Sequence, residues 1–128
     1  MARPVLIIET NALCLSAMSF LVLSAGFQPM AYDTARAACA ALEQIEGEPA
    51  AIITEFDLGS SCESHCIIDS LRRRYPAMPI IVLTADTSAA ARGALEGLDC
   101  HVLFKPSRPD EILALLPTAD AEPHRGRA

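Results

Sequence analysis

The sequence predicts a three-layer, doubly wound α/β domain, a (βα)5 unit in which helices cover both faces of a parallel sheet. Three observations support this fold. Short runs such as VLII, AAIIT and PIIVLT are continuously apolar, as expected for strands whose two faces are both buried. Longer stretches with helical periodicity separate these runs, and a chain of 128 residues has the length of one such domain.

Five pairs of strand and helix are expected in order along the chain. Each pair is given as strand, then helix: 4–8 and 12–25, 27–31 and 34–45, 50–56 and 64–75, 79–84 and 88–96, 101–104 and 109–116. Gly26 can end the first helix in a left-handed cap, and Pro76 ends the third. Ser107 and Asp110 form an S-x-x-D pattern that predicts the start of the last helix. We therefore expect a domain over 1–116 and a mobile tail over 117–128.

Composition and charge narrow the functional classes. The 52% of hydrophobic residues support a packed core. The net charge of -6 leaves no basic surface for phosphates, so direct binding to nucleic acid is not expected. The apolar stretch over 12–27 falls short of the roughly 20 apolar residues of a membrane span, so insertion into a membrane is not expected either. Five cysteines without CxxC spacing indicate reduced thiols in a cytoplasm, and the expected partners are proteins.

Polar residues gather where the predicted strands end. In chain order they are Glu9, Thr10, Glu55, Asp57, Thr84 and Lys105. Ligands of open parallel sheets bind beyond the carboxyl ends of the strands, so these side chains are expected at one edge. Carboxylates hold magnesium, whereas an ammonium and a hydroxyl neutralise phosphate oxygens. The edge therefore predicts a site for a divalent cation and a phosphoryl group.

Four segments resemble the receiver domains of response regulators, over residues 4 to 116. They are VLIIET at the acidic pair of the family, IITEFDLG at its phosphoacceptor, IIVLTA at its switch hydroxyl and FKP at its lysine and proline. The resemblance implies a flavodoxin-like sheet of order 2-1-3-4-5 and a stand-alone signalling module that is not an enzyme. It implies phosphoryl transfer from a histidine kinase, output to another signalling protein, phosphate contacts at Thr84, Ala85 and Lys105, and a bond before Pro106 that is commonly cis.

The phosphorylation site departs from the family at two positions. Glu55 stands at the phosphoacceptor, where one extra methylene displaces the carboxylate by about 1.5 Å, enough to impair in-line transfer. Thr10 replaces one acid of the pair that holds magnesium with Glu9. The family's metal positions are thus Glu9, Thr10, Glu55 and Asp57. Their carboxylates favour a cation, whereas Lys105 and the acid missing at Thr10 oppose it. Impaired or absent phosphorylation is the prediction.

Two alternatives at this site stay open. Asp57 lies two residues after Glu55 and points the same way along a strand, although roughly 6.6 Å further on, so either residue is a candidate acceptor. A charged Glu55 near Lys105 can imitate the phosphorylated state, or it can form a salt bridge that only joins two strand ends. Thr84, likewise, is either the switch hydroxyl or a threonine with a local hydrogen bond.

The first helix is apolar on more than one side. Its sheet-facing residues are expected to be Cys14, Ala17, Met18, Leu21, Val22 and Ala25. Leu13, Leu15, Phe20 and Leu23 then lie on faces that are usually polar. This predicts a partner interface at Leu13, Phe20 and Leu23, either in a homodimer or against a partner helix, unless the tail of the chain covers it. Val102, where many receivers carry an aromatic, is assigned to a partner interface as well.

Two other classes compete with a signalling module. A small flavodoxin-like enzyme or cofactor carrier is disfavoured because the first turn, at Glu9, Thr10 and Asn11, has no glycine or serine-threonine cluster to cradle a phosphate. A purely structural dimerisation domain is the other candidate. Self-association unaffected by changes at Glu55 would distinguish it.

Overall fold

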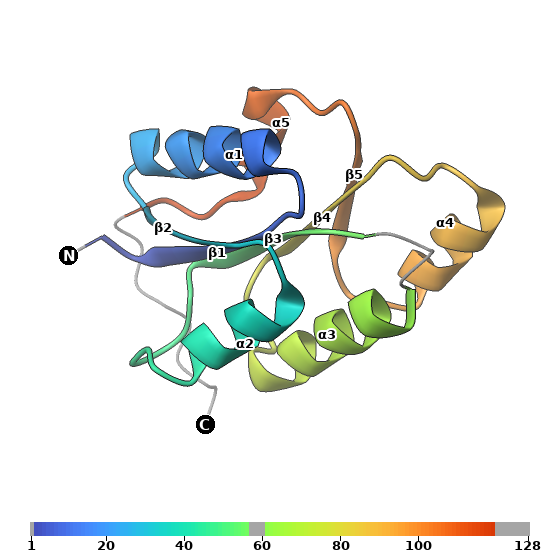
Figure 1. Ribbon diagram of the computed structural model, residues 1–128, viewed down its shortest axis with the longest axis horizontal. Helices are drawn as coiled ribbons and strands as arrows, with labels where there is room; N and C mark the ends of the chain where they lie inside the picture. Colours follow the sequence, from blue (N-terminus) through green and yellow to red (C-terminus); the bar gives the residue numbers. More distant parts are fainter. Residues whose placement is uncertain (1, 57–60, 120–128) are drawn as a thin grey trace.

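A five-stranded parallel sheet of order β2-β1-β3-β4-β5 forms the centre of the protein, as predicted (Figure 1). The computed structural model describes residues 2–56 and 61–119. Their elements are β1 (Pro4–Ile8), α1 (Ala12–Ser24), β2 (Gln28–Tyr32), α2 (Ala35–Leu42), β3 (Ala51–Glu55), α3 (Ser61–Arg74), β4 (Ile80–Thr84), α4 (Ala89–Glu96), β5 (His101–Phe104) and α5 (Pro109–Leu115). The predicted fold class and flavodoxin-like order are confirmed.

The sheet has a buried core on each face. Helices α1 and α5 lie together on one face, and α2 and α3 lie on the other (Figure 1). Val5 and Ile7 of β1 belong to the core under α1 and α5, which we call the α1-side core. Leu6 and Ile8 belong to the opposite core, the α3-side core, to which α4 also contributes. Successive residues of a strand point to opposite faces, so both sets must be apolar, and this explains the unbroken hydrophobic runs.

Several boundaries differ from the expected ones for local reasons. The second strand begins at Gln28 because the Phe27 amide donates to the carbonyl oxygen of Val22, 3.0 Å away, as part of the end of α1. Helix α2 ends at Leu42, where the following turn tightens into bonds spanning three residues. Helix α3 begins three residues before the expected position 64. The first and last strands have the predicted bounds.

Three expectations from the sequence concern the ends of helices and the peptide bond before Pro106. Gly26 has a φ of 96°, the left-handed conformation expected after α1. The peptide bond before Pro106 is cis, as the resemblance implies. The S-x-x-D prediction for the last helix is wrong by one residue, because the backbone N–H of Arg108 donates to Glu111 at 2.9 Å and Asp110 instead pairs with the Arg108 guanidinium.

The chain end returns to α1. Ala119, within the expected tail, packs against the α1-side core, and a Cβ added at Gly26 would lie 3.0 Å from the Cβ of Ala119. Residues 120–128 of that tail lie outside the described residues. Over residues 2–56 and 61–119, no helix is long and apolar enough to cross a membrane.

Candidate functional site

Parallel pairing brings the predicted polar residues to one edge of the sheet. Ile8 is paired with Thr54, Glu55 with Leu83 and Thr84 with Phe104, so β1, β3, β4 and β5 end at the same level. Glu9 and Lys105 directly follow β1 and β5. The edge predicted from sequence therefore gathers Glu9, Glu55, Thr84 and Lys105. Asp57, the alternative acceptor and fourth metal position, lies outside the described residues.

Glu9 and Lys105 form the tightest ion pair of the edge. The Lys105 ammonium donates to Glu9 Oε1 at 2.6 Å, while the other oxygen, Oε2, accepts from the backbone N–H of Asn11 at 3.2 Å. The Glu9 side chain is only 5% exposed and that of Lys105 is 30% exposed. Burial opposes ionisation of both groups. The pKa of Glu9 is nevertheless lowered, first by its contact with Glu55 and then by Lys105 and the Asn11 N–H, and the contact with Glu9 raises the pKa of Lys105.

Glu55 is a second, weaker partner of the same ammonium. Its Oε2 lies 3.9 Å from the Lys105 nitrogen, and its Oε1 accepts a 2.9 Å hydrogen bond from the backbone N–H of Thr10. Burial raises the pKa of Glu55, and the neighbouring Glu9 carboxylate raises it further. The expected proximity of Glu55 and Lys105 is thus present. The sequence reasoning missed Glu9 as the closer partner, because it had assigned that carboxylate to a metal.

The carboxylates described at this edge do not fit a magnesium ion in this arrangement. Magnesium needs oxygen ligands in near-octahedral geometry, yet both oxygens of Glu9 and one oxygen of Glu55 accept N–H groups. Thr10 contributes a backbone donor rather than the acid of the family pair. Among the described residues, no group of three or more His, Cys, Asp or Glu side chains is placed to hold a metal. The positive charge between the two acids is the ammonium of Lys105.

Thr84 and Ala85 lie at the rim of this cluster. The Thr84 side chain is almost fully buried, and its hydroxyl oxygen accepts from the backbone N–H of Asp86 at 3.0 Å. This is the local bond that one of the two interpretations expects. Ala85 is exposed and lines a pocket of about 360 Å³ together with Glu55 and Lys105. The hollow that a phosphoryl group would need is therefore present beside Glu55.

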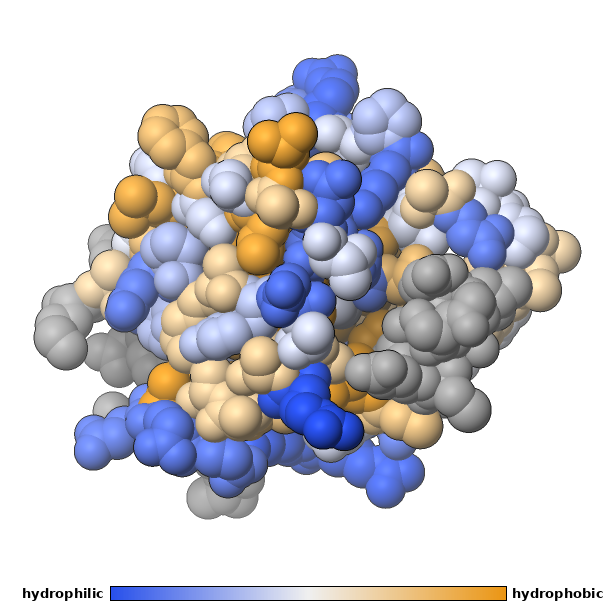
Figure 2. All heavy atoms as spheres, in the orientation of Figure 1, coloured by the Kyte–Doolittle hydropathy of each residue, from blue (hydrophilic) through white to orange (hydrophobic). Residues whose placement is uncertain are grey.

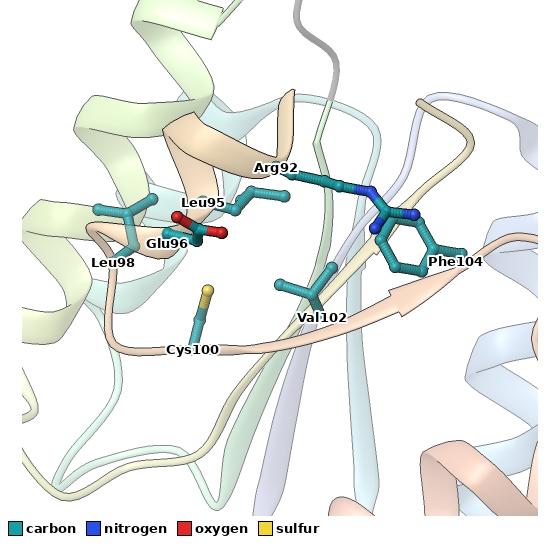
Figure 3. Close-up of a pocket in the computed structure, with 7 residues that line it drawn as sticks. All are labelled: Arg92, Leu95, Glu96, Leu98, Cys100, Val102 and Phe104. Atoms are coloured by element: carbon teal, nitrogen blue, oxygen red, sulfur yellow. The ribbon is translucent and has the colours of Figure 1, made fainter. Parts of the chain in front are cut away.

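A second pocket of about 360 Å³ lies between α4 and β5, where Val102 was assigned to a partner interface. Figure 3 shows Val102 pointing into it, with the Arg92 guanidinium against the ring of Phe104. The guanidinium carbon lies 5.1 Å from the ring centroid, a cation–π contact. Val102 is half-buried against the α3-side core, and its interface role stays a prediction. Phe104, an aromatic residue at the end of β5 that is 38% exposed, was not singled out from the sequence.

Helix α1 exposes the three residues assigned to a partner interface. Leu13, Phe20 and Leu23 are 82%, 74% and 59% exposed, and apolar side chains gather over α1 at the upper left of Figure 2. Two neighbouring expectations are wrong. Leu15 packs against the α1-side core and Ala17 is exposed, so α1 is rotated about its axis relative to the orientation that the sequence match implies.

Comparisons with known proteins find similar folds among solved structures but no matching family. No family model matches the sequence, and no curated protein matches it. Among solved structures, the chain is similar to a response regulator receiver protein from Sinorhizobium medicae, with a TM-score of 0.75 and 21% identity over 90% of this chain and 91% of that one. It is also similar to the chemotaxis protein CheY4 of Vibrio cholerae, with a TM-score of 0.74 and 20% identity over 89% and 95%. The chain therefore has the fold of a response-regulator receiver domain.

Proposed function

We propose that this chain is a receiver-type module of two-component phosphorelay signalling, which works in the cytoplasm by binding other proteins and catalyses no turnover of its own. Its expected partner is a histidine kinase or another signalling protein. The receiver fold supports the proposal, together with the arrival of the four family segments at one edge of the sheet. The observation that carries it is the cluster of Glu9, Glu55 and Lys105 at that edge.

We further propose that phosphorylation is impaired or absent. An aspartate at position 55 would place its carboxylate about 1.5 Å closer to the strand, whereas the longer Glu55 reaches across to the Thr10 amide. Displacing a nucleophile by this amount is costly for an in-line transfer, which depends on near-attack geometry. The Lys105 ammonium, which would neutralise a phosphoryl oxygen, is already held by Glu9.

Magnesium is the cofactor that the fold suggests, and we propose that Lys105 replaces it. An ammonium 2.6 Å from one carboxylate and 3.9 Å from another supplies a positive charge that the chain itself carries. A metal would have to displace this ammonium and break the hydrogen bonds to Asn11 and Thr10. The domain would then keep one arrangement at this edge without kinase or metal. In this arrangement Glu55 is one member of an ion-pair network rather than a separate mimic of phosphate.

The test is the intact mass of the protein after incubation with a small acyl phosphate and magnesium. We expect no phosphoryl adduct on the wild type and a magnesium-dependent adduct on the double variant Glu55→Asp/Thr10→Asp, which restores both acids of the family. Glu55→Asp alone separates the acceptor defect from the metal defect. Asp57→Ala and Glu55→Gln are the matched controls for the two candidate acceptors.

An adduct on the wild type would overturn impaired phosphorylation. Its loss in Asp57→Ala would place the acceptor at Asp57, and its loss in Glu55→Gln would place it at Glu55. Magnesium binding is read separately as the change in melting temperature with millimolar magnesium chloride, because a ligand that binds only the folded state raises that temperature. A rise for the wild type as large as for the double variant would contradict replacement of the metal by Lys105.

A further inference from the structure

The outer face of α1 carries no charge at all. The helix runs ALCLSAMSFLVLS from Ala12 to Ser24, without one acidic or basic side chain. At 100° per residue, Leu13, Phe20 and Leu23 fall within a stripe roughly 80° wide. We call these three residues and the groove beside them the α1 face.

A hollow lies next to this stripe. A groove of about 350 Å³ runs between α1 and α5, with Ala17, Leu21 and Ser24 on one wall and Pro109 and Ile112 on the other. Phe20 stands at its rim and is 74% exposed. One patch therefore holds both a protruding aromatic ring and an apolar hollow with room for such a ring.

We propose that the α1 face binds the α1 face of a second copy of this chain. In a two-fold symmetric interface the same patch meets itself, so each protrusion must find a hollow on that patch. Phe20 and the neighbouring groove satisfy this condition, with the ring of one copy entering the groove of the other. This inference does not rest on the chemistry of Glu55.

The lack of charge on α1 favours a second copy over a strongly charged partner. The chain carries a net charge of -6, yet self-association through α1 brings no charged residue of this helix close to a residue of the same charge. A strongly basic or acidic partner would find nothing on α1 with which to pair. The three exposed side chains present on the order of 300–400 Å² of apolar surface. This is about half of the roughly 800 Å² that each partner buries in a standard interface, and the small residues Ser16, Ala17 and Ser24 beside them extend the contact.

The first test is sedimentation velocity over a wide range of micromolar concentrations. We expect the dimer fraction of the wild type to rise with concentration and Phe20→Ser to raise the dissociation constant at least tenfold. Phe104→Ser, at an exposed phenylalanine on β5, is the matched control and should leave association unchanged. Both sites are on the surface, so far-UV circular dichroism should show intact folds.

The second test asks whether the two α1 helices face each other. Ala17→Glu and Ala17→Lys each place a charge in the groove, so each variant alone should be monomeric because like charges then meet. An equimolar mixture should associate again, through opposite charges across the interface.

Three outcomes would overturn the proposal. A wild type that is monomeric at every concentration would leave the α1 face to another protein or to solvent. Weakening by Phe104→Ser but not by Phe20→Ser would place the interface on the other side of the sheet. If the wild type is dimeric but the mixture of the two Ala17 variants does not associate, the two helices are not in direct contact.

Discussion

Replacing Lys105 by methionine should destabilise the protein more strongly than a substitution at a partly exposed position usually does. Methionine keeps most of the aliphatic stem and removes the ammonium that lies 2.6 Å from Glu9 Oε1. The Glu9 side chain is 5% exposed, so its charge would be left in the protein with the weaker, neutral N–H of Asn11 at 3.2 Å in place of an ammonium. An uncompensated buried charge is among the costliest defects that one substitution can create.

The magnitude follows from the exposure of the two partners. Removing one partner of a fully buried pair costs about 3–5 kcal/mol. Water reaches part of this site, because the Lys105 side chain is 30% exposed, and water can partly solvate the carboxylate left behind. We therefore expect a loss of about 2–3 kcal/mol in the free energy of unfolding at pH 7. For a domain of this size the melting temperature should fall by roughly 6–15 °C.

The assay is urea unfolding of a double-mutant cycle, followed by far-UV circular dichroism. The four proteins are the wild type, Lys105→Met, Glu9→Gln and the variant with both changes. The double variant should recover part of the loss, because a neutral amide at position 9 needs no ammonium. A coupling energy below about 0.5 kcal/mol would refute the reasoning, since that is the range of an exposed ion pair.

The pH dependence of Lys105→Met gives an independent check. Without the ammonium, Glu9 loses two of the causes that lower its pKa while its burial remains, so this pKa should be higher than in the wild type. A raised pKa in the folded state means that stability is regained as the pH falls through that pKa. The cost of the substitution should therefore shrink on acidification. A cost that stays constant between pH 7 and the ordinary pKa would mean that Glu9 is not the group left uncompensated.

Two further predictions concern Glu55 and Gly26. Because the pKa of Glu55 is raised, its ionised form destabilises the fold. Glu55→Gln should therefore be more stable than the wild type at pH 7. The difference in unfolding free energy should vanish as the pH falls from the raised pKa through 4.5. A difference that persists below this window would contradict the assigned titration. Gly26→Ala should cost about 1–2 kcal/mol in urea unfolding, because its φ is 96° and the new Cβ would meet Ala119. Gly97→Ala, at a φ of -77° with no atom in the way, is the control and should be neutral or stabilising.

The sequence was enough to predict the fold because its strongest signals are local. The run VLII in β1 alternates between the two cores, and such a run has one stable place, inside a sheet covered on both faces. Gly26 marks the end of α1 because few other residues adopt a positive φ. Boundaries were less predictable where a residue is buried outside a strand. Phe27 is apolar and in the core, yet its amide belongs to the end of a helix.

The site could be predicted in position but not in its pairing. Parallel strands must bring their carboxyl ends together, so the sequence placed Glu9, Glu55, Thr84 and Lys105 at one edge correctly. Which acid pairs with Lys105 depends on differences of about an ångström in the reach of side chains across strands, which a one-dimensional pattern does not contain. The exposure of Ala17 has a similar origin, because it depends on the rotation of α1 about its own axis on the sheet.

The ion pair between Glu9 and Lys105 also bears on how fast the protein unfolds. Its partners are 96 residues apart in the chain, and the strands that carry them are separated in the sheet by β3 and β4. Closing so long a loop is entropically unfavourable until the intervening strands have aligned, so the pair is expected to form after the folding transition state. An interaction that is absent from the transition state slows unfolding and leaves the folding rate nearly unchanged. The pair at the edge of the sheet therefore acts chiefly on the lifetime of the folded protein.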